Sequence, residues 1–341
     1  MSGLSGQAPQ SGASLPRVPW ASAPLLAALA VSPMVDPPTM PLEQAVGQKV
    51  VTAFSGTSAS PALLKRLRTG HLGGVILFSA NIASPHQLRS LTRSIRSAAA
   101  AGGNPPPLIA VDQEGGLVKR LPWAPPSTSA AAMTNPHAEG VATGRALKQA
   151  GITVNLAPVA DVERRPNFLG SRAFGTTEPE VARDACAFAR GLQRGGVTPT
   201  LKHFPGLGEA TGNTDLERVT IRAPLRLAPY RRCAHRGLVM LSSATYPRLG
   251  KGPAVFEPTA YALLNDSTVT ISDDLTARAM AGRGDVAVRA ARAGLDLLLY
   301  GGSEQTSAGA YRRLLRAVRD GRLGEARVRA SAARIVALKN D

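Results

Sequence analysis

The chain has 341 residues, of which 44% are hydrophobic and 18% are charged, and its formal net charge is +17. This length and composition are typical of a globular protein with a large core and exclude an intrinsically disordered chain. The positive charge predicts attraction to polyanions, but the arginines are scattered along expected helices and form no compact basic block between aromatic residues. We therefore predict no dedicated nucleic-acid binding, with a scaffold that binds acidic polymers as an alternative.

The first 40 residues differ from the rest of the chain. Residues 1–19 are rich in Ser, Gly and Pro, and a short apolar run follows at 25–31. The run is far too short to span a bilayer, so we expect no stable membrane insertion. It is similar to the apolar part of a signal peptide, but only Arg17 precedes it as a positive side chain, so a disordered extension is an equal interpretation. We lean to an exported or cell-envelope protein, with a cytoplasmic one as the alternative.

From residue 41 onward the sequence alternates short apolar runs with amphipathic stretches. Helices are expected where apolar residues recur at i, i+3 and i+7, as Leu88, Leu91 and Ile95 do. In chain order we expect a helix that runs into a short strand over 42–54, and helices over 62–69, 85–100, 138–150, 179–195, 227–236, 258–264, 287–293, 307–319 and 325–339.

Between these helices lie eight apolar runs that we expect to be strands. They are centred near Val50, Val75, Ile109, Val154, Leu201, Met240, Thr270 and Leu298. Continuous apolar strands that alternate with helices predict a parallel sheet covered by helices. Eight such units over this length favour a closed (β/α)8 TIM-type barrel, a single domain over 41–341, above an open doubly wound sheet. No glycine-rich phosphate loop follows the first strands, which argues against nucleotide binding.

The two cysteines, Cys186 and Cys233, lie far apart and belong to no CxxC pattern. Because the five histidines are dispersed as well, no zinc-like spacing exists, and we predict no metal site and no cofactor. Two buried free thiols are the expected state, with a disulfide as the alternative. The chemistry must then come from other polar side chains.

Polar residues follow several predicted strands at their C-terminal ends. The set comprises Asp112, Asp161, His203, Ser243 and Asp273. In a barrel these strand ends meet on one face, where catalytic groups lie. Some acids at such positions cap helices, but several acids and a histidine on one rim favour an active site. Two carboxylates that flank a sugar can hydrolyse a glycoside, because one attacks the anomeric carbon while a second group protonates the leaving oxygen.

Four ordered sequence blocks carry a family resemblance. They are VDQEGG at 111–116, APVAD at 157–161 with GSRAFG at 170–175, LKHFPGLG at 201–208, and ISDDL at 271–275. Their order and spacing resemble glycoside hydrolase family 3, and the third block resembles its N-acetylglucosaminidase (NagZ-type) branch. The resemblance implies a hydrolase that removes terminal β-linked N-acetylglucosamine from cell-wall glycans in peptidoglycan turnover. Its partner would be the carbohydrate substrate, and we expect a monomer.

The resemblance also implies a role for each matching residue. Asp273 would be the nucleophile that forms a covalent glycosyl-enzyme, so the configuration at the anomeric carbon would be retained. Five side chains would hold the sugar hydroxyls: Asp112, Arg120, Arg172, Lys202 and His203. Asp274 would cap or orient its neighbourhood, Cys186 would belong to the core, and Asp296 would be structural.

The loop after the third block departs from the family pattern. Leu207 replaces a histidine of the branch, and Asn213-Thr214-Asp215 replaces its Asp-Ser-His acid/base motif. Asp215 stands at the position of the missing histidine and is our candidate general acid, with a raised pKa. Glu209 on the same loop is the alternative. A catalytically weak or inactive glycan binder and a β-glucosidase-like hydrolase stay as further hypotheses.

Overall fold

The structure is a computed structural model that describes residues 40–164, 167–233 and 237–340. The expected N-terminal extension lies outside these ranges apart from Met40, and so does the end of the helix expected over 227–236. Within the described ranges, no helix is both long enough and apolar enough to cross a membrane.

The helices expected from the sequence each have a counterpart in the described part of the chain, which confirms those predictions. They are α1 (Leu42–Gln48), α2 (Pro61–Arg68), α3 (Pro85–Ala100), α4 (Pro136–Gln149), α5 (Glu178–Arg194), α6 (Ala228–Cys233), α7 (Pro258–Tyr261), α8 (Val286–Ala293), α9 (Glu304–Arg319) and α10 (Glu325–Asn340). Several begin with a capping side chain. In α5, for example, Thr177 and Glu180 form a reciprocal capping box.

The eight expected strands are also present and form one parallel sheet. They are β1 (Val50–Thr52), β2 (Gly74–Leu77), β3 (Leu108–Val111), β6 (Val154–Asn155), β7 (Thr198–Phe204), β8 (Leu238–Leu241), β9 (Val269–Ser272) and β10 (Leu298–Tyr300). Their order is β10-β1-β2-β3-β6-β7-β8-β9. The ends of this order meet, because Leu297 N donates to Thr270 O at 2.8 Å and Leu297 O accepts from Ser272 N at 2.9 Å. The fold is therefore the predicted (β/α)8 TIM-type barrel.

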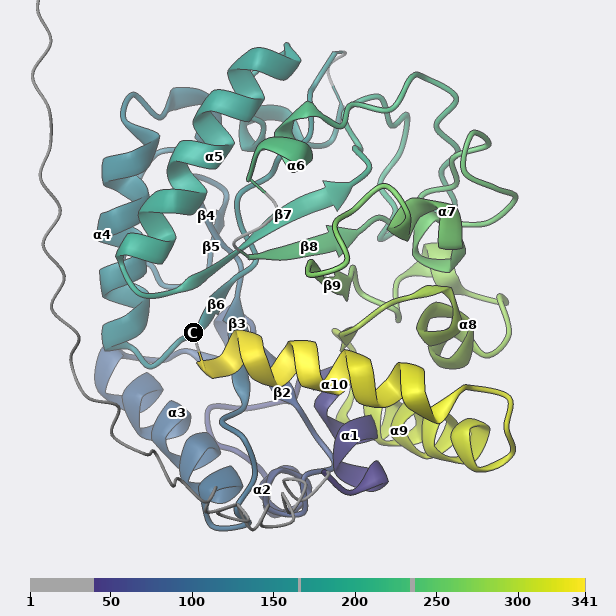
Figure 1. Cartoon of the computed structure of the whole chain (residues 1–341). Helices are drawn as coiled ribbons and strands as arrows, with labels where there is room; N and C mark the ends of the chain where they lie inside the picture. Colours follow the sequence, from purple (N-terminus) through teal and green to yellow (C-terminus); the bar gives the residue numbers. More distant parts are fainter. Residues whose placement is uncertain (1–39, 165–166, 234–236, 341) are drawn as a thin grey trace, which may run out of the picture. The chain divides into compact units, whose positions relative to one another are not determined.

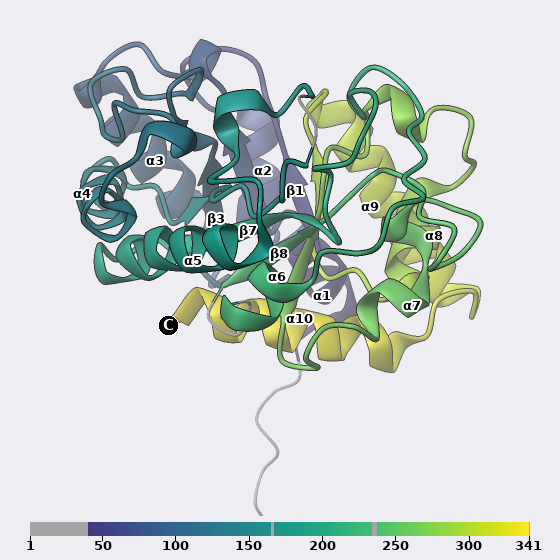
Figure 2. The ribbon, with the colours of Figure 1, turned by 90° about the horizontal axis from the view of Figure 1, so that it is seen from above.

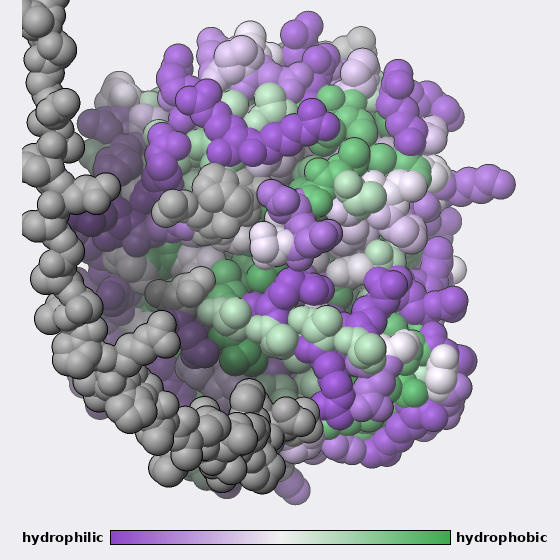
Figure 3. All heavy atoms as spheres, in the orientation of Figure 1, coloured by the Kyte–Doolittle hydropathy of each residue, from purple (hydrophilic) through white to green (hydrophobic). Residues whose placement is uncertain are grey.

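The helices surround the strands on all sides (Figure 1). Seen from above, α3, α4 and α5 lie on one flank of the strands, and α8 and α9 lie on the opposite flank (Figure 2). Hydrophilic side chains cover most of the face drawn in Figure 3, with apolar patches between them. This arrangement leaves the C-terminal ends of the strands as one face on which the connecting loops gather.

In β1, β2, β3, β8 and β10, alternate residues belong to two separate apolar clusters. Val50 and Val75 pack with the helices, whereas Val51 and Ile76 belong to a smaller cluster drawn mainly from the strands. The smaller cluster therefore fills the barrel interior, as the two-residue period of a strand requires. Ile335 of α10 joins it and closes the end of the barrel opposite the C-terminal face.

One short hairpin was not predicted. The strands β4 (Gln113–Gly115) and β5 (Val118–Lys119) pair antiparallel just after β3. They are too short to show a sequence period, which explains why the apolar pattern does not reveal them.

The expectation of two free thiols was wrong. Cys186 in α5 and Cys233 at the end of α6 form a disulfide, with Cα atoms 5.5 Å apart and a sequence separation of 47. Cys186 is fully buried, as expected, but it is also covalently linked. The packing of α6 against α5 brings the two sulfurs together, and sequence spacing alone cannot reveal such a contact.

Candidate active site

A cavity of about 320 Å³ opens at the C-terminal ends of the barrel strands. Every residue to which the sequence assigns a role in catalysis or sugar binding lines it: Asp112, Arg120, Arg172, Lys202, His203, Asp215 and Asp273. They come from loops after β3, β6, β7 and β9, and from β7 itself. Apolar side chains of the barrel interior, among them Ile76 and Met240, line the same cavity.

The β4–β5 hairpin forms one edge of this cavity. Gly115 and Gly116 have φ values of 100° and 57°, and a Cβ on Gly115 would lie only 2.2 Å from Thr128 O. The Gln113 side chain supports the returning strand, because its Oε1 accepts from Arg120 N at 2.9 Å. A glycine pair thus permits the turn that returns Arg120 to the rim.

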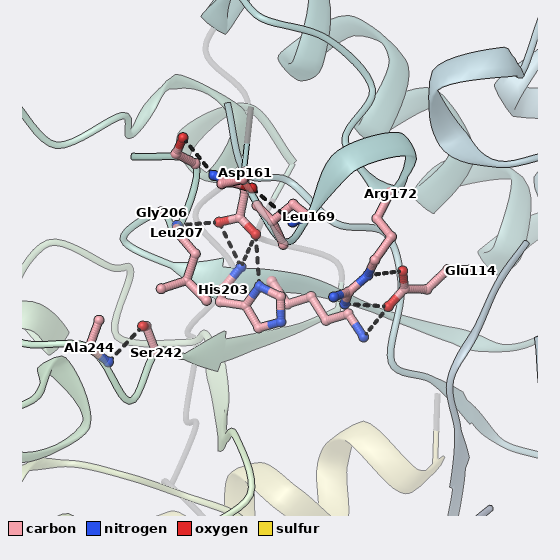
Figure 4. Close-up of polar contacts among 12 residues, drawn as sticks. Glu114, Asp161, Leu169, Arg172, His203, Gly206, Leu207, Ser242 and Ala244 are labelled. Carbon is pink, nitrogen blue, oxygen red and sulfur yellow. Dashed lines mark hydrogen bonds and ion pairs between the residues drawn. The ribbon is translucent and has the colours of Figure 1, made fainter. Parts of the chain in front are cut away.

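Glu114 also lines the cavity, although the sequence interpretation assigned it no role. It is buried, and its Oε2 accepts from Arg172 Nε at 2.8 Å while its Oε1 accepts from Arg172 Nη2 at 2.9 Å (Figure 4). Lys202 Nζ lies 2.7 Å from the same Oε1. Glu114 stands inside the VDQEGG block, so its position was visible, but only the hairpin geometry reveals that it points into the cavity.

Asp112 extends this network toward solvent. Its Oδ1 accepts from Lys202 Nζ at 2.7 Å, and its Oδ2 lies 3.8 Å from Arg120 Nη2. Lys202 therefore donates to two carboxylates and is itself almost fully buried. The result is a compact array of fixed charges, of the kind that holds sugar hydroxyls through charge-assisted hydrogen bonds.

The protonation states of this array follow from its packing. Burial alone would raise the pKa of Glu114, but the charges of Lys202 and Arg172 outweigh burial and lower it to about 2. Burial likewise opposes the charge of Lys202, but Asp112 and Glu114 outweigh it and raise the pKa of that amine. Both groups are therefore ionised at neutral pH, Glu114 as an acceptor and Lys202 as a donor.

Asp161 lies behind His203 and holds it in place. Its Oδ2 is 2.7 Å from His203 Nδ1, and its Oδ1 accepts from Leu207 N at 2.6 Å (Figure 4). His203 N and Tyr230 OH donate to Oδ1 as well, at 3.1 and 3.3 Å. Asp161 is fully buried and is not among the residues that line the cavity, so the expectation that it lies on the rim needs this correction.

The charge of Asp161 decides the tautomer of His203. Burial would raise the pKa of Asp161, but the charge and hydrogen bond of His203 and the backbone N–H groups lower it below its usual value. An ionised carboxylate only accepts, so Nδ1 of the His203 ring must carry a proton. Nε2 is then the ring nitrogen that remains for a substrate in the cavity.

Asp273 follows β9, and Asp274 supports the same turn. Asp273 Oδ1 accepts from Asp274 N at 2.9 Å. The carboxylate of Asp274 accepts from Thr276 N and Gly301 N, both at 2.8 Å. Asp274 thus links the turn after β9 to the end of β10. Such contacts fit the capping or orienting role expected of Asp274.

Asp215 lies at the mouth of the cavity on the loop that follows β7. A Cβ on Gly208 would lie 1.8 Å from Val162 O, so this glycine permits the loop to pack closely on its neighbour. Partial loss of hydration, and then the negative charge of Asp273, raise the pKa of Asp215. Asp215 and Asp273 both line this cavity.

The other candidate acids lie elsewhere. Glu209 is not among the cavity residues, and its Oε1 is 3.8 Å from Arg226 Nη2. Asp296 lies at the opposite end of the barrel, where its Oδ1 accepts from Ser331 Oγ and Arg334 Nη2, both at 2.7 Å, as a structural acid would. Ser243 follows β8 but is buried outside the cavity. Within the described ranges, no cluster of three or more His, Cys, Asp or Glu residues is arranged to hold a metal ion.

Comparison with known proteins agrees with this geometry. The model of the glycosyl hydrolase family 3 N-terminal domain matches residues 42–338. An uncharacterized secreted glycosyl hydrolase of Arthroderma benhamiae is 32% identical over 338 residues, 90% of this chain and 96% of that protein. The β-hexosaminidase LpqI of Mycobacterium tuberculosis is 31% identical over 79% of this chain and 76% of its own length.

Solved structures give the same result. A family 3 β-N-acetylglucosaminidase from Paenibacillus superposes with a TM-score of 0.84 and 33% identity over 88% of this chain. The chain spans 62% of the length of that structure. The resemblance carried by the four sequence blocks is thereby confirmed. The chain belongs to glycosyl hydrolase family 3 and is a glycoside hydrolase of its β-N-acetylhexosaminidase branch.

Proposed function

We propose that this protein removes terminal β-linked N-acetylglucosamine from cell-wall-type glycans with retention of configuration. The observation that carries the proposal is the composition of one cavity. It holds a charged network suited to sugar hydroxyls and, beside it, two carboxylates, Asp273 and Asp215. That combination matches the two chemical tasks of a glycosidase.

The sugar would be held by the charged network before any bond breaks. Lys202 and Arg172 donate hydrogen bonds, and Asp112 accepts them, so hydroxyl groups can pair with both kinds of partner. Arg120 and His203 complete the set of binding residues at the rim. Glu114 pairs with Lys202 and Arg172 and holds both side chains in place. Because they are already ordered, little of their conformational entropy is lost when the sugar binds.

The first chemical step would be attack by Asp273 on the anomeric carbon. A bond forms between a carboxylate oxygen of Asp273 and that carbon, and the bond to the leaving oxygen breaks. The proton of Asp215 moves to the leaving oxygen, so the aglycone departs as a neutral alcohol and Asp215 becomes a carboxylate. The product of this step is a glycosyl ester of Asp273.

The second step would return the enzyme to its starting state. Asp215, now ionised, accepts a proton from a water molecule, whose oxygen attacks the anomeric carbon. The ester bond to Asp273 breaks, which releases the sugar with its original configuration. Two inversions at one carbon account for the retention.

The division of labour between the two acids rests on their surroundings. Asp215 has the raised pKa, through partial loss of hydration and the charge of Asp273, so it keeps its proton to a higher pH than an ordinary aspartate. Asp273 Oδ1 accepts a hydrogen bond from Asp274 N at 2.9 Å, which orients this side chain in the cavity. General acid assistance contributes about 10²- to 10⁴-fold to rate, which is the part assigned to Asp215.

The named activities of relatives support the choice of substrate. The relative in Mycobacterium tuberculosis is called a β-hexosaminidase, and the Paenibacillus structure is titled a β-N-acetylglucosaminidase. On the same comparison we propose that the protein acts in cell-wall glycan turnover. We also propose that it is exported and monomeric. The Cys186–Cys233 disulfide supports export, because disulfides persist in oxidising compartments, and one relative is described as secreted.

The experiment compares release of nitrophenol from the 4-nitrophenyl glycosides of N-acetyl-β-glucosamine and β-glucose. We expect turnover of the first, a much lower rate with the second, and loss of activity in Asp273→Ala. Undiminished activity in that variant would refute the assignment of the nucleophile. Faster release from the β-glucoside would indicate a β-glucosidase-like enzyme, and sugar affinity without turnover would indicate a glycan-binding protein.

A further inference from the structure

Four arginines lie on the segments that follow Asp215 and β9, and we call them the arginine group: Arg218, Arg278, Arg283 and Arg289. Three of their side chains donate to backbone oxygens. Arg218 Nη2 donates to Ala281 O at 2.5 Å, and Arg283 Nε donates to Ala279 O at 2.6 Å. Arg289 Nη1 donates to Arg283 O at 2.6 Å. These contacts hold three of the guanidinium groups against the backbone of residues 279–283.

This stretch packs directly against the loop that carries Asp215. Arg278 N donates to Asp215 O at 3.1 Å, and Ala279 N donates to Thr214 O at 3.3 Å. Thr214 and Asp215 both line the cavity. The arginine group therefore borders the cavity on the side of the proposed general acid.

None of the four side chains takes part in an ion pair within the described part of the chain, and nearby Asp285 pairs with Arg313 at 3.4 Å. Burial, and then the charges of Arg218 and Arg289, lower the pKa of Arg283. Like charges held close together without a counter-charge create a local potential that attracts an anion.

We propose that the arginine group is a subsite for a negatively charged group, a carboxylate or a phosphate, on the leaving part of the glycan. The inference rests on the proposed function. The charged network around Lys202 holds the sugar that is cleaved, and Asp215 protonates the leaving oxygen. The leaving part must then extend past Asp215, where the arginine group meets it. Guanidinium groups suit both anions because their parallel N–H groups can pair with two oxygens.

The test compares substrates that differ only in charge on the leaving group. We would use 4-nitrophenyl N-acetyl-β-glucosaminide and two analogues whose phenyl ring carries a carboxylate or a phosphate. The measured quantity is the ratio of kcat/KM for each anionic substrate to that for the neutral one. The intrinsic reactivity of each substrate is the same for every enzyme variant. A change in this ratio between variants therefore measures a change in how the protein recognises the anionic group.

The decisive variant is Arg218→Gln/Arg278→Gln. At low salt we expect its ratio to fall about 3- to 10-fold below that of the unmodified enzyme, as loss of two exposed ion pairs allows. Arg218→Lys/Arg278→Lys keeps the charge and should keep most of the ratio. Added salt should lower the ratio of the unmodified enzyme toward that of the glutamine variant. The anion that shows the larger fall is the preferred ligand.

A matched control removes two exposed arginines of α3 that form no ion pair with any described residue, in Arg89→Gln/Arg93→Gln. Its ratio should equal that of the unmodified enzyme. An unchanged ratio in the Arg218/Arg278 glutamine variant, or an equal fall in the control, would overturn the proposal in favour of the general surface charge. Failure of the proposed function would appear differently, as no turnover of the neutral substrate. Calorimetric binding of the same glycosides would then supply the ratio.

Discussion

Replacement of Asp161 by asparagine should change the hydrogen-bonding character of the active-site histidine. The amide keeps an oxygen for the N–H of Leu207, but it presents an NH2 group to His203 Nδ1 where the carboxylate oxygen lay at 2.7 Å. A donor at that position requires an unprotonated Nδ1. The ring proton therefore moves to Nε2, and a sugar hydroxyl that had donated to Nε2 loses its acceptor.

The size of the effect follows from the bond that is lost. A hydrogen bond to a charged group contributes about 1.5–3 kcal/mol. If the transition state depends on it, kcat/KM falls about 10- to 100-fold at about 1.4 kcal/mol for each factor of ten. Tyr230→Phe removes one longer, neutral donor from the same carboxylate and should cost clearly less. Asp161→Asn with His203→Ala should cost little more than His203→Ala alone, because both changes remove one interaction.

The assay combines ¹⁵N NMR of the histidine ring with kinetics on the 4-nitrophenyl glycoside. The unmodified enzyme should show the proton on Nδ1 of His203, and Asp161→Asn should show it on Nε2. The matched control is Asp296→Asn, a buried carboxylate at the opposite end of the barrel, which should leave both the tautomer and kcat/KM unchanged. The same tautomer in Asp161→Asn, or strictly additive losses in the double variant, would refute the reasoning.

Three further predictions concern the acid, the barrel floor and the disulfide. Because the pKa of Asp215 is raised, kcat/KM should fall as pH rises through that pKa; Asp215→Asn should remove this alkaline limb and slow poor leaving groups about 10²- to 10⁴-fold. Asp296→Ala should lower the free energy of unfolding by about 3–5 kcal/mol in denaturant titrations, because it removes the carboxylate whose charge stabilises the buried Lys49 ammonium, while kcat of the folded enzyme persists. Cys186→Ser/Cys233→Ser should lower the free energy of unfolding by about 2–4 kcal/mol; an unchanged value would contradict a disulfide closed over 47 residues.

The sequence predicted the barrel well because each strand is a short continuous apolar run between amphipathic helices. Such a pattern predicts both the type of element and its burial. The positions of β1 and β10 could therefore be predicted without knowledge of the strands with which they pair. The same reasoning predicted a rim of polar residues, since parallel strands end on one face. This reasoning could not predict which of those residues face the cavity. Asp161 and Ser243 follow strands as Asp112 does, yet both lie outside the cavity.

The remaining features depend on contacts between distant segments. Glu114 points inward because a glycine-supported hairpin too short for any periodic signal folds back after β3. The Cys186–Cys233 pair forms because α6 packs on α5. Glu209 and Asp215 lie on the same loop, and both are carboxylic acids that could act as the general acid. The folded loop distinguishes them, because Glu209 lies near Arg226 whereas Asp215 lines the cavity.

The most direct test of the account is to trap the glycosyl-enzyme and identify its site by peptide mass spectrometry. A fluorinated N-acetylglucosaminyl fluoride, which forms the ester faster than water removes it, would serve as the probe. The account predicts one sugar adduct per chain, on the peptide that contains Asp273, and none in Asp273→Ala. An adduct on another residue, or turnover without any adduct and with inverted product, would contradict it.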